Sequence, residues 1–410
     1  MGGCILGKTL LIISGGLEAV PGIKKAKEMG LNVLVSDIDL NAPGFEFSDD
    51  KIIASTYDYI KTERLAREYN ENKKKIDGVI SFSADVPYTV SYVAKSLGLP
   101  GLSLETASLS SDKLKMKDKL KDNGIPLPFY WKVDNLVELK EVVKKQGFPL
   151  IIKPIDSRGA RGVFLLTKVD MLEWAFEHSK SESPSSKVIV EEYLDGPQIS
   201  TEAIIIDGKG YPIGFSDRNY ELLYSHSPYI IENGGDMPSS LSESNQTKIA
   251  ETAINAGLAL GIRNGIVKGD MVLSKDGPKV IEVATRLSGG WFSTDQIPLS
   301  TGVDLISAAI NQALAIKINT KDLIPKYHKG VAIRYFFPKP GKVFKIKDFN
   351  IFRDKKWLHK IAFFIKSGDI VPEVTDHTKR VGFVITTGKS KLEAIKNAKI
   401  IVDFVENSTD

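Results

Sequence analysis

Hydrophobic and polar positions in the first hundred residues predict strands and helices largely in alternation. Short apolar runs are followed by stretches with helical spacing, and glycines mark several of the ends. We expect these elements over residues 8–14, 17–29, 31–37, 52–54, 59–70 and 77–82. The alternation predicts a parallel sheet with helices on both faces. This layer is Rossmann-like, but the Gly-x-Gly-x-x-Gly motif does not follow its first strand, which disfavours an NAD-dependent dehydrogenase.

The pattern changes near residue 111, beyond which longer strands are joined by tight turns. A Lys-rich helix is expected over 112–123, followed by shorter elements over 129–133, 136–146, 149–153, 163–166 and 169–178. Long strands with an antiparallel pattern are expected over 188–193, 199–207, 211–218, 266–274 and 279–285, with helices over 247–260 and 303–315. A small α/β segment closes the chain, with strands near 330–337 and 381–387 and a helix over 391–405. The fold class is therefore α/β at the start and α+β beyond.

Composition and charge exclude several classes of protein. The chain has 410 residues, 42% hydrophobic and 26% charged, which excludes a disordered chain, a collagen-like chain and a coiled-coil rod. Lys and Arg number 55 against 51 Asp and Glu, and a net charge of +4 predicts no nucleic-acid partner. No apolar run reaches the ~18 residues of a membrane span, so no membrane partner is expected. The single cysteine, Cys4, excludes an internal disulfide and favours a cytoplasmic location.

Residues 2–9 match the P-loop pattern Gly-x-x-x-x-Gly-Lys-Thr letter for letter. A P-loop binds phosphate only when a strand precedes it and a helix follows, because the helix N-terminus supplies the amides. Here a strand is predicted directly after the motif. We therefore do not interpret residues 2–9 as a nucleotide site.

A strand that ends in lysine and the loop after it form the first candidate phosphate site. Lys153 ends a predicted strand, and residues 156–162 carry Gly159 and Gly162 before the next strand begins. Such a loop lets backbone amides approach phosphate oxygens, with Lys153 as a point charge at its base. A structural hairpin accounts for the pattern equally well. Lys113, upstream on the Lys-rich helix, is by itself an ordinary solvated lysine.

A second candidate lies in residues 190–196, where a strand carries Glu191 and Glu192 and then leaves through a Gly-Pro turn. Extended backbone at a domain hinge can bind an adenine edge through its own N–H and C=O groups. Glu191 can accept a hydrogen bond from the exocyclic amine. An ordinary edge strand is the alternative.

The most specific candidate is a pair of carboxylates on a predicted hairpin. Asp270 and Glu282 lie on two strands joined by a turn over 274–278, which sets them side by side on one face. Two carboxylates suit Mg²⁺, which takes its remaining ligands from water and substrate phosphates. Arg286 follows four residues after Glu282, and its guanidinium is suited to holding a phosphate or a carboxylate. A solvated face is the alternative for the carboxylate pair.

The order and spacing of these residues resemble the ATP-grasp superfamily over nearly the whole chain. The resemblance implies an N-terminal pre-grasp domain over 1–105, a grasp module over 106–320 and a C-terminal domain over 321–410. The grasp module divides into a lid lobe at about 125–190 and a metal-binding lobe at about 191–320. Residues 331–336 and 376–382 are similar to the C-terminal domain of biotin carboxylase and the phosphoribosylglycinamide synthetases.

The resemblance also implies roles for the matching residues. Lys113 and Lys153 would hold the α- and β-phosphates, Asp270 and Glu282 would bind the metal, and residues 156–162 would form a lid. Lys153 and Arg286 are the implied catalytic residues. The implied ATP-binding residues are Lys113, Lys153, Ser157, Arg158, Gly159, Gly162, Glu191, Glu192, Tyr193, Leu194, Gln198 and Glu202. The implied cofactors are ATP and two Mg²⁺ ions, with Mn²⁺ as a substitute.

Two positions depart from the pattern of the superfamily. Many members have Glu-x-Asn-Pro-Arg, whose Asn binds metal, whereas Ala284 stands at that position here. Many members also have a ribose-binding Glu after the hinge glycine, where this chain has Gln198. Glu202, four residues further on, is the alternative ribose ligand.

The resemblance implies a ligase that phosphorylates a carboxylate with ATP. An amine then displaces phosphate from the acyl phosphate, so that ADP and phosphate are released. The loop after Glu282 looks like that of the amino-acid ligases, which makes a small carboxylate such as an amino acid the expected substrate. The candidate substrate-binding residues are Arg218, His226, Arg286, Ser288, Gly289, Gly290 and Trp291.

Several functions besides amino-acid ligation stay open at this point. The Arg-Arg-His-Gln-Lys run of biotin carboxylase is absent from 216–221, which disfavours bicarbonate. A purine-pathway synthetase and a non-catalytic nucleotide-binding subunit both stay open. A core position for Trp291 and a surface position for His226 are favoured over the substrate pocket. For His377 and Arg380, a structural role within their own domain is favoured over a position that faces the cleft. Relatives with this C-terminal domain imply a homodimer.

Overall fold

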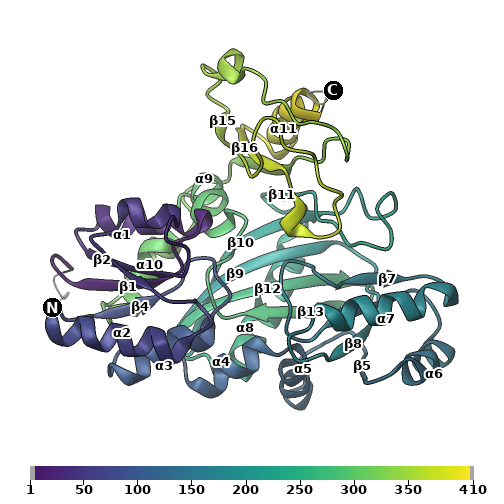
Figure 1. Ribbon diagram of the computed structural model, residues 1–410, viewed down its shortest axis with the longest axis horizontal. Coiled ribbons are helices and arrows are strands. Elements are labelled where there is room, and N and C mark those ends of the chain that lie inside the picture. The colour runs from purple at the N-terminus through teal and green to yellow at the C-terminus, as the bar shows by residue number, and fades with distance from the viewer. Residues whose placement is uncertain (1–4, 407–410) are drawn as a thin grey trace.

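The computed structural model describes residues 5–406 (Figure 1). They form an N-terminal unit, a lid lobe and a C-terminal unit around a large central sheet. The N-terminal unit is a four-stranded parallel sheet in the order β3-β2-β1-β4. Its strands are β1 (Thr9–Ile13), β2 (Asn32–Asp37), β3 (Asp50–Ile53) and β4 (Gly78–Ile80). The parallel sheet predicted from the alternating pattern is therefore confirmed. Gly2 to Cys4 of the P-loop look-alike lie outside the described residues, and its last residue, Thr9, begins a strand as expected.

Helices cover the sheet of the N-terminal unit and connect it to the next part of the chain. They are α1 (Val20–Glu28), α2 (Tyr59–Asn72), α3 (Pro87–Ser96), α4 (Leu104–Ser111) and α5 (Lys113–Asp122). The helices α3 and α4 were missing from the prediction. The first begins at a proline, and the second has little amphipathic pattern to mark it, with the sequence Leu-Glu-Thr-Ala-Ser-Leu-Ser-Ser.

The lid lobe, residues 125–190 in the prediction, contains a small antiparallel sheet in the order β5-β8-β6-β7. The strands are β5 (Tyr130–Val133), β6 (Leu150–Pro154), β7 (Phe164–Leu166) and β8 (Val188–Glu192). The helices α6 (Leu136–Gln146) and α7 (Leu172–Ser181) pack on this sheet, and Figure 1 shows them at the right of the molecule.

The central sheet has eight strands in the order β13-β12-β9-β10-β11-β14-β16-β15. Five of its strands precede residue 300, namely β9 (Gln198–Ile206), β10 (Lys209–Asn219), β11 (Gly234–Met237), β12 (Gly265–Ser274) and β13 (Gly277–Ala284). The other three are β14 (Gly330–Tyr335), β15 (Leu358–Phe363) and β16 (Gly382–Gly388). Because β11 pairs antiparallel with β14, one hydrogen-bonded sheet continues across the domain boundary proposed near residue 320.

The prediction had no strand at β11 or β15, although β11 is the strand that connects the two parts of the sheet. Its sequence, Gly-Gly-Asp-Met, has neither the alternation nor the β-branched residues that mark a strand. Tertiary pairing on both sides holds it in the sheet instead.

The remaining helices place the units against one another. They are α8 (Glu243–Ala259), α9 (Ile297–Thr301), α10 (Leu305–Ala313) and α11 (Lys391–Glu406). Shorter turns are 3-10 helices at Leu17–Ala19, Pro43–Phe47, Val169–Met171, Thr320–Leu323, Phe349–Phe352 and His377–Lys379, with a π-helix at Phe292–Gln296. The helix α10 contacts α1, β4 and β12, so it joins the N-terminal unit to the central sheet.

One buried apolar cluster runs through the N-terminal unit, the central sheet and the C-terminal unit. It includes Leu10 of β1, Ile204 of β9, Phe383 of β16 and Trp291, which directly precedes the π-helix. Each of these residues is at most 4% exposed. Burial of this shared surface favours one relative arrangement of the units. None of the helices in residues 5–406 has the length and apolar character that a bilayer crossing requires.

Candidate active site

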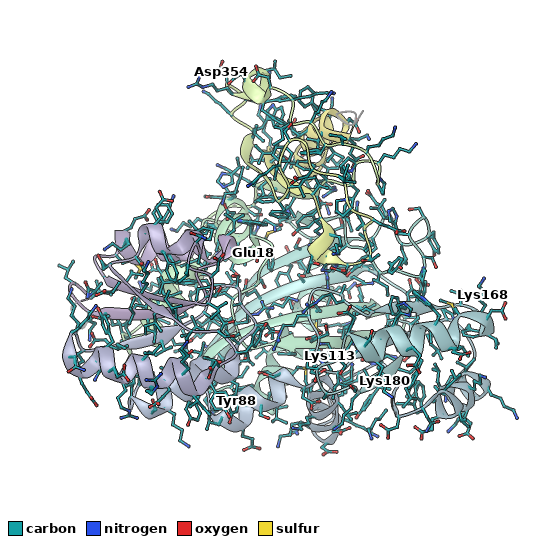
Figure 2. The ribbon with its side chains drawn as sticks, in the orientation of Figure 1. Glu18, Tyr88, Lys113, Lys168, Lys180 and Asp354 are labelled. Atoms are coloured by element: carbon teal, nitrogen blue, oxygen red, sulfur yellow. The ribbon has the colours of Figure 1, made fainter. Side chains whose placement is uncertain are left out.

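A cavity of about 590 Å³ lies where the N-terminal unit, the lid lobe, the central sheet and the C-terminal unit meet. Most of the candidate residues from the sequence line it, namely Lys113, Lys153, Ser157, Arg158, Gly159, Glu191, Glu192, Tyr193, Leu194, Gln198, Arg218, Asp270, Glu282, Arg286, Ser288, Gly289, Gly290 and Trp291. Three candidates, Gly162, Glu202 and His226, do not line it. In Figure 2, Glu18 lies where the N-terminal unit faces the C-terminal one, and Lys113 lies beside the lid lobe.

One end of the cavity is a buried cluster of two lysines and a glutamate, which we call the lysine cluster. The Glu191 carboxylate on β8 lies 2.8 Å from Lys153 Nζ on β6 and 3.2 Å from Lys117 Nζ on α5. Each of these side chains is at most 6% exposed. Burial alone would raise the pKa of the Glu191 carboxyl, but the two ammonium groups outweigh it and hold the pKa below its ordinary value.

Lys117 is a site residue that the sequence analysis missed. It is one of several lysines on α5, and only the fold shows that it points inward. Its Nζ also donates to the backbone carbonyl of Ile281, and burial lowers its pKa to about 8. The Glu191 carboxylate is held by these two lysines, and its contact with the adenine amine stays a prediction.

Lys113 links the lid loop to the carboxylate hairpin. It is the first residue of α5 because Asp112 caps that helix, accepting hydrogen bonds from two backbone N–H groups. Its Nζ donates to the carbonyl of Ser157 at 2.9 Å and lies 3.4 Å from the Glu282 carboxylate. Its position on a Lys-rich helix gave no local sign of this contact.

The lid loop over residues 156–162 is held by residues from two other units. The Arg158 side chain donates to Asp85 at 2.9 Å, and the backbone N–H of His377 donates to the carbonyl of Gly159 at 3.0 Å. Gly162 has φ +70°, and a Cβ there would lie 2.9 Å from Pro154 Cγ. The expectation that Gly162 contacts ATP is therefore corrected to a conformational role at the end of the loop.

The two predicted metal ligands are directly opposite each other on β12 and β13, as the spacing indicated. Asp270 also forms ion pairs with Arg218 at 2.7 Å and with Lys268. Burial alone would raise the pKa of Asp270, but these two cations outweigh it and hold the pKa well below its ordinary range. Arg218 donates from Nε to Glu232 at 2.9 Å, so its charge is shared between two carboxylates.

Within residues 5–406, no group of three or more His, Cys, Asp or Glu side chains is placed to hold a metal ion by itself. Ala284 provides no third ligand at the position where many family members have Asn. Mg²⁺ in phosphate-transfer sites, however, binds through one or two carboxylates, waters and the substrate phosphates. Asp270 and Glu282, adjacent across one pair of strands, fit that mode of binding.

Arg286 lies between the N-terminal unit and the carboxylate hairpin. Its Nε is 3.5 Å from the Asp85 carboxylate, and its Nη1 donates to the carbonyl of Leu287 at 3.0 Å. Burial alone would raise the pKa of Asp85, but Arg286 and Arg158 outweigh it and hold the pKa below its ordinary value. Asp85, in the loop after β4, was missed because a lone acidic residue in a loop gives no local signal.

The loop from Ser288 to Trp291 is fixed by two carboxylates. Glu202 accepts from the backbone N–H of Ser288 at 2.8 Å and from the Ser293 hydroxyl at 2.6 Å. Glu18 accepts from the backbone N–H of Gly290 at 3.0 Å. Burial raises the pKa of Glu202 to about 7. Glu202 is fully buried, so its expected contact with ribose is wrong.

Trp291 has both of the positions that the sequence left open. Its ring stacks on Phe383 at 3.7 Å between centroids and is 4% exposed, yet it also lines the cavity. His226 instead lies in the loop after β10, where its Nδ1 is 3.0 Å from the neighbouring Ser225 hydroxyl. His226 is half-buried and does not line the cavity, so the structure gives no support to the substrate contact expected of it.

The cavity also contains His377 and Arg380, for which a structural role was favoured. Both come from the C-terminal unit, at and just after the short helix His377–Lys379. They reach the cavity because β16, which follows them, is paired with β14 of the central sheet. The expectation that they serve only their own domain is thus corrected.

Comparison with known proteins agrees with this arrangement. Residues 110–290 match the ATP-grasp domain, and residues 334–409 match the L-amino acid ligase C-terminal domain 2. Alanine–anticapsin ligase of Bacillus subtilis is 27% identical over 62% of this chain and 58% of its own length. The chain thus matches less than two thirds of that curated relative.

Two solved structures match almost the full length of both chains. The L-amino acid ligase from Bacillus licheniformis has a TM-score of 0.80 at 21% identity, covering 98% of each chain. The phosphoribosylglycinamide synthetase from Anaerococcus prevotii has a TM-score of 0.73 at 20% identity, covering 98% of this chain and 99% of its own. At these identities the likeness shows the fold alone. Residues 110–290 of this chain thus form an ATP-grasp domain that lines the cavity, followed by an L-amino acid ligase C-terminal domain 2 over residues 334–409.

Proposed function

We propose that the protein uses ATP to activate a small carboxylate, an amino acid, as an acyl phosphate and joins it to an amine. One observation carries this proposal. Lys113, Lys153, Asp270, Glu282 and Arg286 come from separate segments and line a single cavity. Phosphoryl transfer needs positioning and charge neutralisation more than covalent help from the protein, and this set supplies both.

A carboxylate oxygen of the first substrate forms a bond to the γ-phosphorus of ATP, and the bond between that phosphorus and the bridging oxygen of ADP breaks. The amine nitrogen then bonds to the acyl carbon and loses a proton, while inorganic phosphate leaves. The products are an amide, ADP and phosphate.

The residues of this chain have separate tasks in that reaction. Lys113 and Lys153 bind phosphate oxygens, and Arg286 neutralises charge on the phosphoryl group in transfer. Asp270 and Glu282 would hold Mg²⁺, which supplies charge neutralisation on the phosphates when bound. Both metal carboxylates are already adjacent to cations, so their positions are set before the nucleotide binds.

The lid loop excludes water from the acyl phosphate. In this structure Asp85 and His377 hold the loop from two sides, one in the N-terminal unit and one in the C-terminal unit. An acyl phosphate hydrolyses when water reaches it, so a loop closed by both units favours amide formation over wasteful hydrolysis.

The relatives support an amino acid as the substrate class. The matching C-terminal domain is that of L-amino acid ligases, and the alanine–anticapsin ligase is a curated relative. A homodimer stays a prediction from the sequence resemblance.

The test is release of ADP and phosphate from Mg-ATP with pooled amino acids, pooled small amines and bicarbonate. We expect ADP that depends on the amino-acid pool and rises further when an amine is added. AMP in place of ADP would contradict the acyl-phosphate route. Turnover with bicarbonate alone would place the protein with the carboxylases, and no turnover despite ATP binding would favour a non-catalytic subunit.

A further inference from the structure

Most of the cations that line the cavity are paired with a carboxylate. Arg218 pairs with Glu232 and Asp270, and Lys268 also pairs with Asp270. Two further cations of the cavity, Arg286 and Lys153, have partners in Asp85 and Glu191, respectively. Around Arg218 the charges of Lys268, Asp270 and Glu232 are therefore largely balanced without a ligand.

Arg380 is different from these cations. Among residues 5–406 no carboxylate forms an ion pair with it. Its Nη2 donates to the backbone carbonyl of Glu232 at 2.7 Å, and its guanidinium carbon lies 3.5 Å from the centre of the Tyr335 ring. Its Nε is buried and has no hydrogen-bond partner among those residues. The stacked ring leaves the edge of the guanidinium plane available for a ligand, and that edge carries N–H donors suited to a carboxylate.

The segment that carries Arg380 is held in place before any ligand binds. Asp376 is 8% exposed and accepts hydrogen bonds from the backbone N–H of Thr378 at 2.8 Å and from its hydroxyl at 2.5 Å. Nearby, His377 Nε2 is also buried without a hydrogen-bond partner among the described residues. The backbone N–H of His377 donates to Gly159 of the lid loop. A ligand at Arg380 is therefore enclosed by the same lid that covers the phosphates.

We propose that Arg380 determines substrate specificity by binding a carboxylate that is not the one activated. This inference rests on the proposed ligase function and names the chemistry of its substrate. Beside Arg218 and Lys268, whose charges are balanced by Glu232 and Asp270, a guanidinium without a protein counter-ion adds one positive charge, which suits a single carboxylate. A phosphate dianion would leave excess negative charge there. The carboxylate has two sources, the α-carboxylate of an amino-acid acceptor or a second carboxylate on the acyl donor.

The test compares acids with their amides in the wild type and in Arg380→Met. Acceptor pairs are L-alanine with L-alaninamide and glycine with glycinamide, and donor pairs are L-glutamate with L-glutamine and L-aspartate with L-asparagine. One of the two substrates, acceptor or donor, carries the carboxylate that Arg380 binds. For that substrate we expect KM of the acid to rise roughly 10- to 100-fold in Arg380→Met, while kcat and the KM of the amide change less than about twofold. Arg380→Lys should restore part of the affinity, because it keeps the charge but loses the fork.

Lys379→Met is the matched control, since Lys379 is the exposed neighbour on the same segment. It should leave every KM unchanged. Equal changes for acid and amide in Arg380→Met, or a lower melting temperature with loss of both activities, would show a structural role and overturn the proposal.

A binding measurement separates this inference from the proposed function. Melting temperatures are measured with Mg-ADP and succinate, L-alanine or inorganic phosphate, in the wild type and in Arg380→Met. If no amino acid supports ADP release, the proposed function fails, yet stabilisation by a carboxylate that Arg380→Met abolishes still supports the anion site. Stabilisation by inorganic phosphate in preference to both carboxylates, or equal responses in the two proteins, would overturn the carboxylate assignment.

Discussion

Lys153 and Glu191 of the lysine cluster line the same cavity as Arg218, Asp270 and Arg380, but the two groups of residues span different lengths of chain. Lys117, Lys153 and Glu191 come from one helix and two paired strands within about 75 residues. Arg218, Asp270 and Arg380 come from three strands or loops that extend to the C-terminal unit. The first region is compact in sequence, and the second is assembled only by the eight-stranded sheet.

The two regions also differ in how their charges are balanced. In the lysine cluster two ammonium groups share one carboxylate, which leaves a surplus of positive charge. Around Arg218 the ion pairs alternate between cations and carboxylates. We propose that the nucleotide binds at this local excess of charge, whereas substrate selection depends on the few groups that long-range packing leaves without a partner.

Glu282 lies between the two regions, and its loss should have the largest effect. Glu282→Gln keeps the size of the side chain but removes the charge that would bind the metal. We expect ADP formation to fall at least about 1,000-fold, with the melting temperature nearly unchanged. The control is Asp276→Asn at the exposed turn of the same hairpin, which should keep full activity. Full activity in Glu282→Gln would contradict the metal assignment.

The lysine cluster is tested by Lys153→Met. This change leaves the buried Glu191 carboxylate with only one cation, so unfolding free energy should fall by about 3–5 kcal/mol, and KM for ATP should rise roughly 10- to 100-fold. Chemical denaturation and steady-state kinetics measure the two effects. The exposed Lys187→Met is the matched control. An unchanged KM for ATP would remove Lys153 from the phosphate site.

The pH dependence of stability tests Glu202, the carboxylate that fixes the loop from Ser288 to Trp291. Its carboxyl has a pKa of about 7 in the folded protein, above the ordinary value of 4.5. The folded state therefore binds a proton that the unfolded state has released between these values, and stability falls as pH rises from 4.5 through 7. We expect wild type to lose roughly 3 kcal/mol relative to Glu202→Gln over that range. Parallel stability curves for the two proteins would contradict this pKa.

Asp85 should have the smallest effect, because it holds the lid and takes no part in the chemistry. Asp85→Asn weakens the contacts to Arg158 and Arg286 but keeps the volume of the side chain. Without nucleotide, we expect trypsin to cut after Arg158 or Arg161 about 5- to 30-fold faster. Mg-ATP should protect the loop in both proteins. A cleavage rate equal to that of Asp276→Asn would show that Asp85 does not hold the lid.

Sequence reasoning found the elements with strong periodicity and the chemistry carried by short motifs. The parallel N-terminal sheet and the Asp270–Glu282 pairing were predicted from apolar runs and a hairpin turn, both local signals. Lys117 and Asp85 were not found, and for His377 and Arg380 a position in the cleft was the less favoured alternative. Each is a single polar residue whose meaning depends on a partner more than 70 residues away in the chain.

Gly162 and Glu202 show the reverse error, because they were predicted to bind ATP but do not line the cavity. Both residue types suit a nucleotide site, and both lie near others that line the cavity. In the folded protein they have structural roles. Gly162 allows a positive φ beside Pro154, and Glu202 fixes the loop of Trp291. Residue type limited what each could do, and burial decided which of these occurred.

The sequence by itself determined the strands and helices with strong periodicity and the charged residues available to the cavity, because hydrophobic period and turn chemistry act over a few residues. It did not determine α3, α4, β11 or β15. Only the tertiary structure decided which of those charges are paired. The pairing of β11 with β14 brings the C-terminal unit to the cavity and sets Arg380 there without a carboxylate partner among residues 5–406. The physical reason is that an ion pair depends on distance in space, and that distance is set by sheet register and core packing between segments far apart in the chain.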